Sequence, residues 1–262
     1  MPLIDPVLLK DRLATQSGRF DVDALDECDS TSSELLRRAD RGAPSGTVVV
    51  ADRQTAGRGR RGRQWLSQPE QGLTFSLLWR FPGNAMRLAG LSLAVGLAVA
   101  EALEQLGAQG VRLKWPNDIL LAQGDGFAKL GGILIELASD RRGTQAVIGI
   151  GINLAAPAGD LLQPAAGLAQ AMHQVPERHV LFAAILERLA VILDLFAVHG
   201  FPGAKTAWQR LHAWQDMPVS ILGEERVLTG TCLGVDDDGS LLLQTESGVE
   251  RILSGDVSLR RA

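Results

Sequence analysis

Four arginines and three glycines fill seven consecutive positions in the segment GRGRRGR, residues 57–63. Glycine lets the backbone approach a ligand closely, and arginine guanidinium groups match phosphate oxygens in bidentate pairs. Four cations in one loop repel each other, so an anion that neutralises them should order the loop. The segment therefore indicates a phosphate-bearing ligand, with an RG-type nucleic-acid segment or a solvated loop as alternatives. It is neither a Walker A nor a Rossmann loop, because it lacks GK[ST] and no helix pattern follows it.

A cation, an amide and a carboxylate lie within five residues in the segment KWPND, residues 114–118. A strand pattern leads into this segment, and Pro116 ends the strand. One interpretation is that Lys114 binds phosphate while Asn117 or Asp118 binds magnesium or ribose. The alternative is an Asx-type turn after the proline, in which Asn117 and Asp118 only cap backbone groups.

Two further segments place glycines inside apolar strand patterns, where they often mark a close approach of a ligand or of another backbone. Lys129 and Gly131 share one face of KLGGILIE, and a lysine beside bare backbone suits a negatively charged reacting group. Gly149, Gly151 and Asn153 share one face of GIGIN, opposite the isoleucines, which predicts a smooth floor for a flat ligand. The alternatives are a β-bulge after a surface lysine and close packing of another element on the glycines.

The triplet Asp29-Ser30-Thr31 opens a predicted helix, and its hydroxyls either cap the helix or point into a pocket. The sequence contains no GxSxG, no HExxH and no Ser/His/Asp signature. All four histidines lie in the C-terminal half, where we interpret them as surface or core residues: His173, His179, His199 and His212.

Composition limits the class of protein. The 262 residues include 26 basic and 30 acidic side chains, and the net charge of -4 argues against a globally basic nucleic-acid binder. Cys28 and Cys232 show no metal or disulfide spacing, so we expect a reducing compartment. The uncharged run 88–100 is too short for a bilayer and predicts a buried helix. The N-terminus has no signal-peptide pattern, so we expect a cytoplasmic protein that does not engage a membrane.

The patterns along the chain position these segments. Residues 1–25 could form one helix, and the capping-box spacing at Thr31-Ser32-Ser33-Glu34 predicts a helix that stops at Gly42. Residues 54–71 lack periodicity and predict a long loop, and residues 139–143 predict a polar loop between two strands. Further helices are predicted at 87–106, 178–199 and 203–213. Strands are predicted at 46–51, 73–79, 111–115, 118–121, 129–137 and 145–154, and in the tail at 219–222, 227–235, 241–244 and 249–253.

This order predicts an α+β fold with a largely antiparallel sheet. The tail predicts a small all-β domain, because its short strands are separated by turn clusters. We therefore expect two domains, an α+β domain at 1–214 and a C-terminal β-domain at 215–262.

The segments taken together resemble the biotin protein ligase (biotin–[acetyl-CoA-carboxylase] ligase) family from about residue 26 to the C-terminus. The resemblance rests on DST, QTAGRGRRGRQW, KWPNDILL, KLGGILIE and GIGINL, in the expected order. It implies a class II synthetase-like catalytic fold, in which helices flank a mixed, mainly antiparallel sheet, followed by an SH3-like C-terminal β-barrel. It also implies ATP-dependent formation of biotinyl-5'-AMP with release of pyrophosphate, using Mg²⁺. Biotin would then pass to a lysine of a biotin carboxyl carrier protein, that of acetyl-CoA carboxylase or a related biotin enzyme.

The resemblance also implies roles for individual residues. Biotin contacts correspond to Ser30, Thr31, Gln54, Gly57, Arg58, Arg60, Lys129, Gly149 and Gly151. Nucleotide contacts correspond to Arg60, Arg61, Trp65, Lys114, Asn117 and Asn153. Catalytic roles correspond to Arg58, Lys114 and Lys129, and a metal role to Asp118. Many members read DSTN where this chain has Ser32, so we leave Ser32 out of the expected site.

The charges imply a mechanism, because the biotin carboxylate and the α-phosphate are both anions and repel each other at contact in a dry site. Arg58, Arg60, Lys114, Lys129 and Mg²⁺ would screen this repulsion. Closure of the arginine loop would keep water off the mixed anhydride. No protein nucleophile is needed.

Three other functions remain open at this level. A lipoate ligase shares the fold and chemistry, although the arginine loop and KWPND argue against it. A ligand-sensing DNA-binding repressor would carry an N-terminal winged helix, for which we see no room before Asp29, so we expect no DNA binding. An RNA-binding RG protein would lack any ATP reaction. We expect a monomer or a weak homodimer.

Overall fold

The main sheet has seven strands in the part of the chain that the computed structural model describes, residues 2–66, 68–141, 143–158, 163–223, 227–253 and 258–261. The first two strands pair in parallel and the other neighbours are antiparallel, which confirms the predicted mixed, mainly antiparallel sheet. Across the sheet the order is β1 (Asp21–Cys28), β2 (Thr47–Gln54), β3 (Gly72–Phe81), β7 (Gly143–Asn153), β6 (Gly126–Asp140), β5 (Asp118–Gln123) and β4 (Val111–Lys114).

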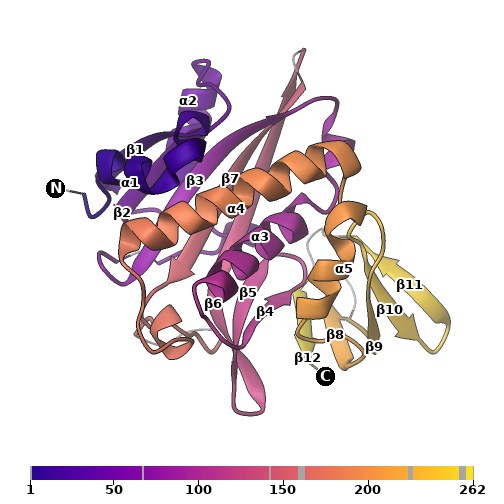
Figure 1. Ribbon diagram of the computed structural model, residues 1–262. Coiled ribbons are helices and arrows are strands. Elements are labelled where there is room, and N and C mark those ends of the chain that lie inside the picture. Colours follow the sequence, from indigo (N-terminus) through magenta and orange to yellow (C-terminus); the bar gives the residue numbers. More distant parts are fainter. Residues whose placement is uncertain are drawn as a thin grey trace.

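Helices cover one face of this sheet almost completely. Figure 1 shows α4 (Arg178–His199) and α3 (Leu91–Gln105) crossing this face, and α1 (Pro6–Leu13) and α5 (Pro202–Leu211) pack against them. The alternation of β3 and β7 directs large apolar side chains toward these helices. Buried members of this core include Phe75, Leu77, Ile148, Ile150, Ile152 and Phe182.

The opposite face of the sheet is covered only in part. There α2 (Thr31–Asp40) packs Leu35 on Val49, Leu78 and Val147, a small separate apolar cluster. Further along the same strand faces, glycines and hydroxyl residues replace the apolar side chains. The sheet therefore leaves an uncovered floor beside α2.

The most apolar helix lies in the core, as the sequence predicts, but begins later than expected. Ala85–Leu88 form a 3-10 turn, and Gly90 adopts a left-handed φ of 78° before α3 starts at Leu91. A Cβ at Gly90 would lie 2.7 Å from the Phe201 ring, so the close contact requires glycine. By length and composition Ala85–Gln105 could cross a membrane, but 67% of its most apolar window is buried in the fold, as in a core helix.

The N-terminal region contains a strand that the sequence patterns did not predict. The expected helix is short, α1 ends at Leu13, and after a 3-10 turn β1 runs along the sheet edge from Asp21 to Cys28. Its sequence, DVDALDEC, is rich in acidic residues, which are uncommon in strands but are tolerated at an exposed edge. The next helix is capped by Ser30 rather than Thr31, because the Ser30 side chain accepts a hydrogen bond from Ser33 N.

The predicted polar loop at 139–143 is mostly strand. β6 continues to Asp140 and β7 begins at Gly143, so the two strands form a long hairpin. The Ser139 and Thr144 hydroxyls hydrogen-bond across it at 2.9 Å. Polar side chains here mark an exposed hairpin end rather than a break in the sheet.

The tail forms a second, five-stranded antiparallel sheet beside α5 (Figure 1). Its order is β11 (Gly248–Ile252), β10 (Leu241–Thr245), β9 (Val227–Val235), β8 (Pro218–Leu222) and β12 (Ser258–Arg261), the last of which the sequence did not predict. The two sheets meet where the Trp115 indole N–H donates to the Gly239 carbonyl at 3.0 Å. Gly239 has a φ of 78°, and a Cβ there would lie 2.8 Å from Gly90 Cα.

Candidate functional site

The floor of the site is the uncovered face of β3 and β7. Thr74 pairs with Gly151 and Ser76 with Gly149 in the strand register, so each rung joins one hydroxyl and one bare backbone position. The Trp65 indole lies on Gly151, where a Cβ would be 2.3 Å from its Cε2 atom. The indole N–H donates to the Thr74 hydroxyl at 3.4 Å. The smooth floor predicted for the GIGIN face is therefore covered by an aromatic ring.

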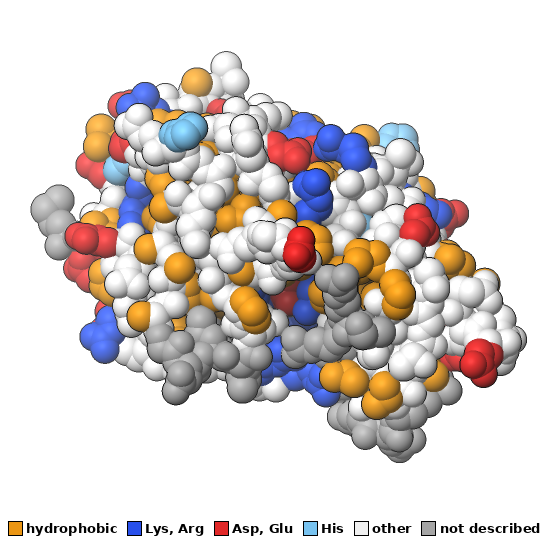
Figure 2. Space-filling view, turned by 90° about the horizontal axis from the view of Figure 1, so that it is seen from below, with side chains coloured by type: hydrophobic (Ala, Val, Ile, Leu, Met, Phe, Trp, Pro, Cys, Tyr) orange, Lys and Arg blue, Asp and Glu red, His pale blue; other side chains and the backbone are white. Residues whose placement is uncertain are grey.

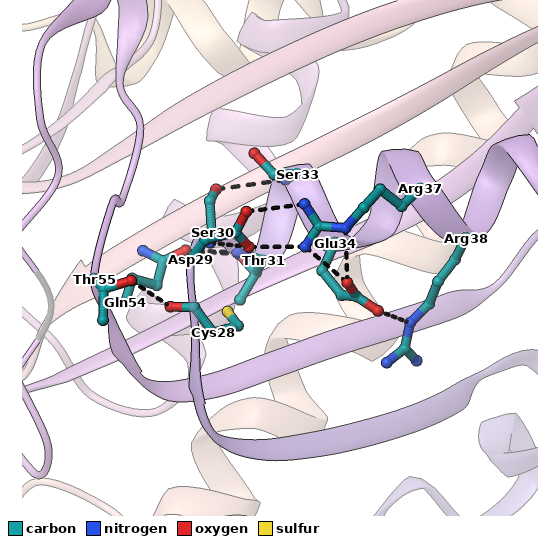
Figure 3. Close-up of polar contacts among 10 residues, drawn as sticks. All are labelled: Cys28, Asp29, Ser30, Thr31, Ser33, Glu34, Arg37, Arg38, Gln54 and Thr55. Atoms are coloured by element: carbon teal, nitrogen blue, oxygen red, sulfur yellow. Dashed lines mark hydrogen bonds and ion pairs between the residues drawn. The ribbon is translucent and has the colours of Figure 1, made fainter.

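One end of the floor is lined by hydroxyl and amide groups at the start of α2 (Figure 3). Gln54, at the end of β2, accepts hydrogen bonds on Oε1 from the Thr31 N–H at 2.8 Å and from the Thr31 hydroxyl at 3.2 Å. Ser30, Thr31 and Gln54 are all at least nine-tenths buried. Because buried polar groups cost free energy unless they are paired, such a cluster suits a ligand with complementary donors and acceptors.

An ion network holds this end in place. Figure 3 shows Arg37 reaching from α2 to Asp29, and its two hydrogen bonds are 2.9 and 2.8 Å long. These bonds lower the pKa of Asp29 to about 2. The Asp29 carboxylate also accepts from Ser30 N at 2.7 Å. The pair therefore ties the segment that carries Ser30 to the rigid helix.

The two cysteines are poor nucleophiles at neutral pH. Burial, with Asp29 and Glu34 nearby, raises the pKa of Cys28 to about 11. Burial likewise raises the pKa of Cys232 to about 11. A thiol reacts as its thiolate, so neither residue is poised for covalent catalysis.

The opposite end of the floor carries two lysines around one carboxylate. Asp118 Oδ1 lies 2.6 Å from Lys129 Nζ, and its Oδ2 lies 3.7 Å from Lys114 Nζ. Burial alone would raise the pKa of Asp118, but the charges of Lys129 and Lys114 outweigh it and hold the pKa below its ordinary value. Lys129 also lies 5.7 Å above the Trp65 ring, and Lys114 lies 5.0 Å above the ring of Trp214. Both ammonium groups are thus held beside the Asp118 carboxylate.

The glycine- and arginine-rich segment forms a loop over the floor, as predicted. Its ends are held by backbone bonds, from Ala56 N to Asp29 O at 2.8 Å and from Trp65 N to Gly57 O at 2.9 Å. Arg60 donates to Asn117 Oδ1 at 3.1 Å, and Arg58 pairs with the carboxylate of Glu136 on β6. An anionic ligand that recruits Arg58 must therefore compete with Glu136.

One cavity of about 650 Å³ brings nearly all the predicted residues together. Figure 2, which views the molecule from below, shows a hollow near the middle of this face with basic and acidic side chains inside it. The predicted residues that line the cavity are Ser30, Thr31, Gln54, Arg58, Arg60, Arg61, Trp65, Lys114, Asn117, Asp118, Lys129, Gly149, Gly151 and Asn153.

Gly57 is the predicted residue that does not line this cavity. It borders a neighbouring cavity of about 910 Å³ on the outer side of the loop. A Cβ at Gly57 would lie 2.3 Å from the Trp65 carbonyl oxygen and 2.8 Å from Gln54 Nε2. Gly57 therefore lies behind Trp65 and Gln54, which both line the first cavity.

Other lining residues were absent from the sequence prediction. Ser32, which we left out, lines the cavity beside Gly149, and a Cβ on Gly149 would be 2.5 Å from Ser32 Oγ. Leu259 reaches the cavity from the second sheet. No local pattern marks Leu259, because its contact depends on how the two sheets pack.

The described residues do not fit a protein-held Mg²⁺ site. Asp118 is engaged by two lysines, and the Asn117 amide accepts from Arg60 and donates to Ile133 O at 2.9 Å. The described part of the chain contains no group of three His, Cys, Asp or Glu residues that could hold a metal ion. In this structure the Asp118 carboxylate pairs with Lys114 and Lys129, and its metal role stays a prediction.

Replacing Gly151 by valine should push the Trp65 ring off the floor, because even a Cβ at this position would overlap the indole. If the ring stacks on a nucleotide base, as the family resemblance implies, ATP binding should weaken by roughly 5- to 150-fold, which corresponds to a stacking contribution of about 1–3 kcal/mol. Calorimetric titration with ATP measures this change. Gly126→Val is a matched control in the same sheet, since its nearest contact to a Cβ is 3.9 Å away. Equal affinities for wild type and Gly151→Val would contradict the assigned position of the ring.

Comparison with known proteins agrees with this geometry. The chain matches the model of the Biotin/lipoate A/B protein ligase family over residues 27–153 and that of the Biotin protein ligase C terminal domain over residues 217–260. It is 36% identical to the bifunctional ligase/repressor BirA of Escherichia coli, over 89% of this chain and 72% of that protein. It is 35% identical to the biotin–[acetyl-CoA-carboxylase] ligase of Paracoccus denitrificans, over 87% of this chain and 96% of that protein.

A solved structure supports the same assignment. The biotin protein ligase from Aquifex aeolicus in complex with biotin and ATP superposes with a TM-score of 0.79 at 35% identity. The match covers 92% of this chain and 99% of that one. The motifs, the fold and these relatives agree, and the chain belongs to the biotin protein ligase family.

Proposed function

We propose that this protein is an ATP-dependent biotin–protein ligase that forms biotinyl-5'-AMP and transfers biotin to a lysine of a biotin carboxyl carrier protein. The observation that carries the proposal is the single cavity with a hydroxyl and amide end, an indole-covered floor and a cationic end. The similarity to a ligase solved with biotin and ATP supports the same substrates.

The two ends of the cavity suggest how the substrates lie. The bicyclic ring of biotin, which carries a urea, would occupy the hydroxyl and amide end at Ser30, Thr31 and Gln54. Its carboxylate would then point toward Lys129. The nucleotide would contact Trp65, Asn117 and Asn153, with its phosphates near Lys114 and the loop arginines. This places two anions between fixed cations.

The first step joins these anions. A carboxylate oxygen of biotin attacks the α-phosphorus of ATP, the bond from that phosphorus to the bridging oxygen breaks, and pyrophosphate leaves. Arg58, Arg60, Lys114 and Lys129 would lower the barrier by offsetting the mutual repulsion and the charge that builds up on the phosphoryl oxygens. In the second step the neutral amine of the carrier lysine attacks the biotinyl carbonyl, an amide bond forms as the bond from that carbonyl to the phosphate oxygen breaks, and AMP and a proton leave.

Asp118 would hold the two lysines in position between turnovers. Its ion pairs hold both ammonium groups beside the same carboxylate. Mg²⁺ in proteins is often held by one or two carboxylates together with substrate phosphates. The described residues offer no free carboxylate cluster, so we assign no step to a protein-bound metal.

The decisive assay is isotope exchange between ATP and pyrophosphate with and without biotin. We expect exchange only when biotin is present, followed by labelling of one lysine when a biotin carboxyl carrier domain is added. An exchange rate that does not depend on biotin, or that rises with lipoate instead, would contradict the proposal. Competition of biotin against lipoate in the same assay separates the two ligases.

We also propose that the protein acts in the cytoplasm without binding DNA, as a monomer or weak homodimer. The net charge of -4 supports the absence of a broad nucleic-acid surface. Titration of a labelled duplex at several salt concentrations tests this, because specific binding would be tight and would weaken with salt. Sedimentation measures the oligomeric state.

A further inference from the structure

A chain of buried hydroxyl groups lies under the amide end of the cavity. Ser76 on β3 hydrogen-bonds Thr31 Oγ1 at 2.9 Å and Ser32 Oγ at 3.0 Å, and Thr31 continues to Gln54. Ser76 has no solvent exposure and does not line the cavity. It reaches the site through the two hydroxyls that it joins, and it lies beside its strand partner Gly149, which lines the cavity.

The direction of these hydrogen bonds follows from one backbone group. The Thr31 N–H donates to Gln54 Oε1, which fixes the orientation of the amide, because its other terminal atom is itself a donor. The Thr31 hydroxyl must then donate to Oε1 as well. Each hydroxyl has one proton, so the three contacts are all hydrogen bonds only if Ser76 donates to Thr31 and Ser32 donates to Ser76.

This direction determines what the cavity can recognise. The protons of Thr31 and Ser32 are already used, so both oxygens face a ligand as acceptors only. The Gln54 NH₂ group, in contrast, is a donor. A ligand at this end must therefore present an N–H group to the hydroxyls and a carbonyl to the amide, which is the pattern of a cyclic urea.

We propose that Ser76 is a positioning residue that sets the proton direction in Thr31 and Ser32, and thereby selects a ligand with urea N–H groups over one without them. The inference rests on the proposed function, since biotin carries such a urea and lipoate does not. It gives Ser32 an acceptor role. Without the Ser76 hydroxyl, the Ser32 hydroxyl could rotate and offer a proton toward the ligand N–H.

The test measures the Kd of biotin by calorimetry without ATP, and KM and kcat in the exchange assay. Ser76→Ala should weaken biotin binding and raise KM for biotin by about ten-fold, the size of one lost hydrogen bond. Neither kcat nor KM for ATP should change by more than about two-fold, because the cationic end is intact. Ser76→Cys keeps the side-chain shape with a weaker donor and should give an intermediate Kd.

Two further variants separate positioning from loss of stability. Thr144→Val removes another buried hydroxyl of the same sheet, at the far end of β7, and should lower stability without changing the Kd of biotin. In a Ser32→Ala background, Ser76→Ala should have a smaller effect than in the wild type, because Ser76 acts in part through Ser32.

The outcomes are distinct. If the wild type does not bind biotin, the proposed function is wrong. If Ser76→Ala and Ser76→Cys bind biotin with the same Kd as the wild type, the proposed role of Ser76 is contradicted while the ligase function stands. A loss in Ser76→Ala that is matched by Thr144→Val would also overturn the inference, because it would reflect stability alone.

Discussion

Replacing Lys129 by methionine should lower the rate of biotin-dependent ATP–pyrophosphate exchange by about 10²–10³-fold, as for loss of one preorganised group that stabilises transition-state charge. Methionine keeps much of the apolar stem of lysine and removes only the ammonium group. That group is held 2.6 Å from Asp118 and above the Trp65 ring, in the same cavity as Lys114. Its charge is therefore already in position before the anions meet.

Steady-state exchange assays with saturating biotin and ATP measure this loss. Lys205→Met is the matched control, because Lys205 pairs with the exposed Asp237 and lies outside the cavity. We expect the control to retain wild-type exchange. A Lys129→Met enzyme within a few-fold of the wild type would mean that Lys129 does not stabilise the reacting charges.

Replacing Asp118 by asparagine should destabilise the fold at pH 7 by about 3–5 kcal/mol, the cost of breaking a buried ion pair by removing one partner. The Asp118 side chain is 11% exposed and is the shared counter-ion of Lys114 and Lys129. Asparagine keeps the side-chain shape but leaves the buried Lys114 and the partly buried Lys129 ammonium groups to repel each other. Urea unfolding at pH 7 measures the change, and equal stability of both proteins would contradict this role.

The pH dependence has a definite sign. Because the folded protein holds the pKa of Asp118 below its ordinary value, the carboxylate contributes stability above the unfolded pKa of about 3.9. This stability is lost as the pH falls through the folded pKa. The stability difference between wild type and Asp118→Asn should therefore shrink in acid.

The sequence predicts the elements whose pattern is local and regular. The alternation in GIGIN places Gly149 and Gly151 on the site floor and the isoleucines in the core, as the structure has them. Helix 178–199 is predicted at its observed bounds, because it is long and apolar. The acidic edge strand β1 is missed, because at an edge its side chains need not follow an apolar alternation.

The site is predictable where a residue type carries the chemistry by itself. The arginine loop and the two lysines signal an anion, and the structure brings them to one cavity. Ser76 could not be found this way, since a serine in an apolar strand signals nothing until the register places Gly149 beside it. The metal role of Asp118 was implied by the family resemblance. The ion pair between Asp118 and Lys129 depends on how two strands pack, so KWPND alone could not predict it.

The bond from the Trp115 indole to the Gly239 carbonyl has a consequence for protein engineering. Trp115 directly follows Lys114 in the chain. The second sheet therefore contacts the backbone one residue away from a proposed phosphate contact. Grafting the tail of a relative onto this enzyme is therefore not a neutral exchange of modules. A chimera would have to preserve the turn at Gly239 and its close contact with Gly90. Otherwise the grafted tail would shift the backbone that positions Lys114.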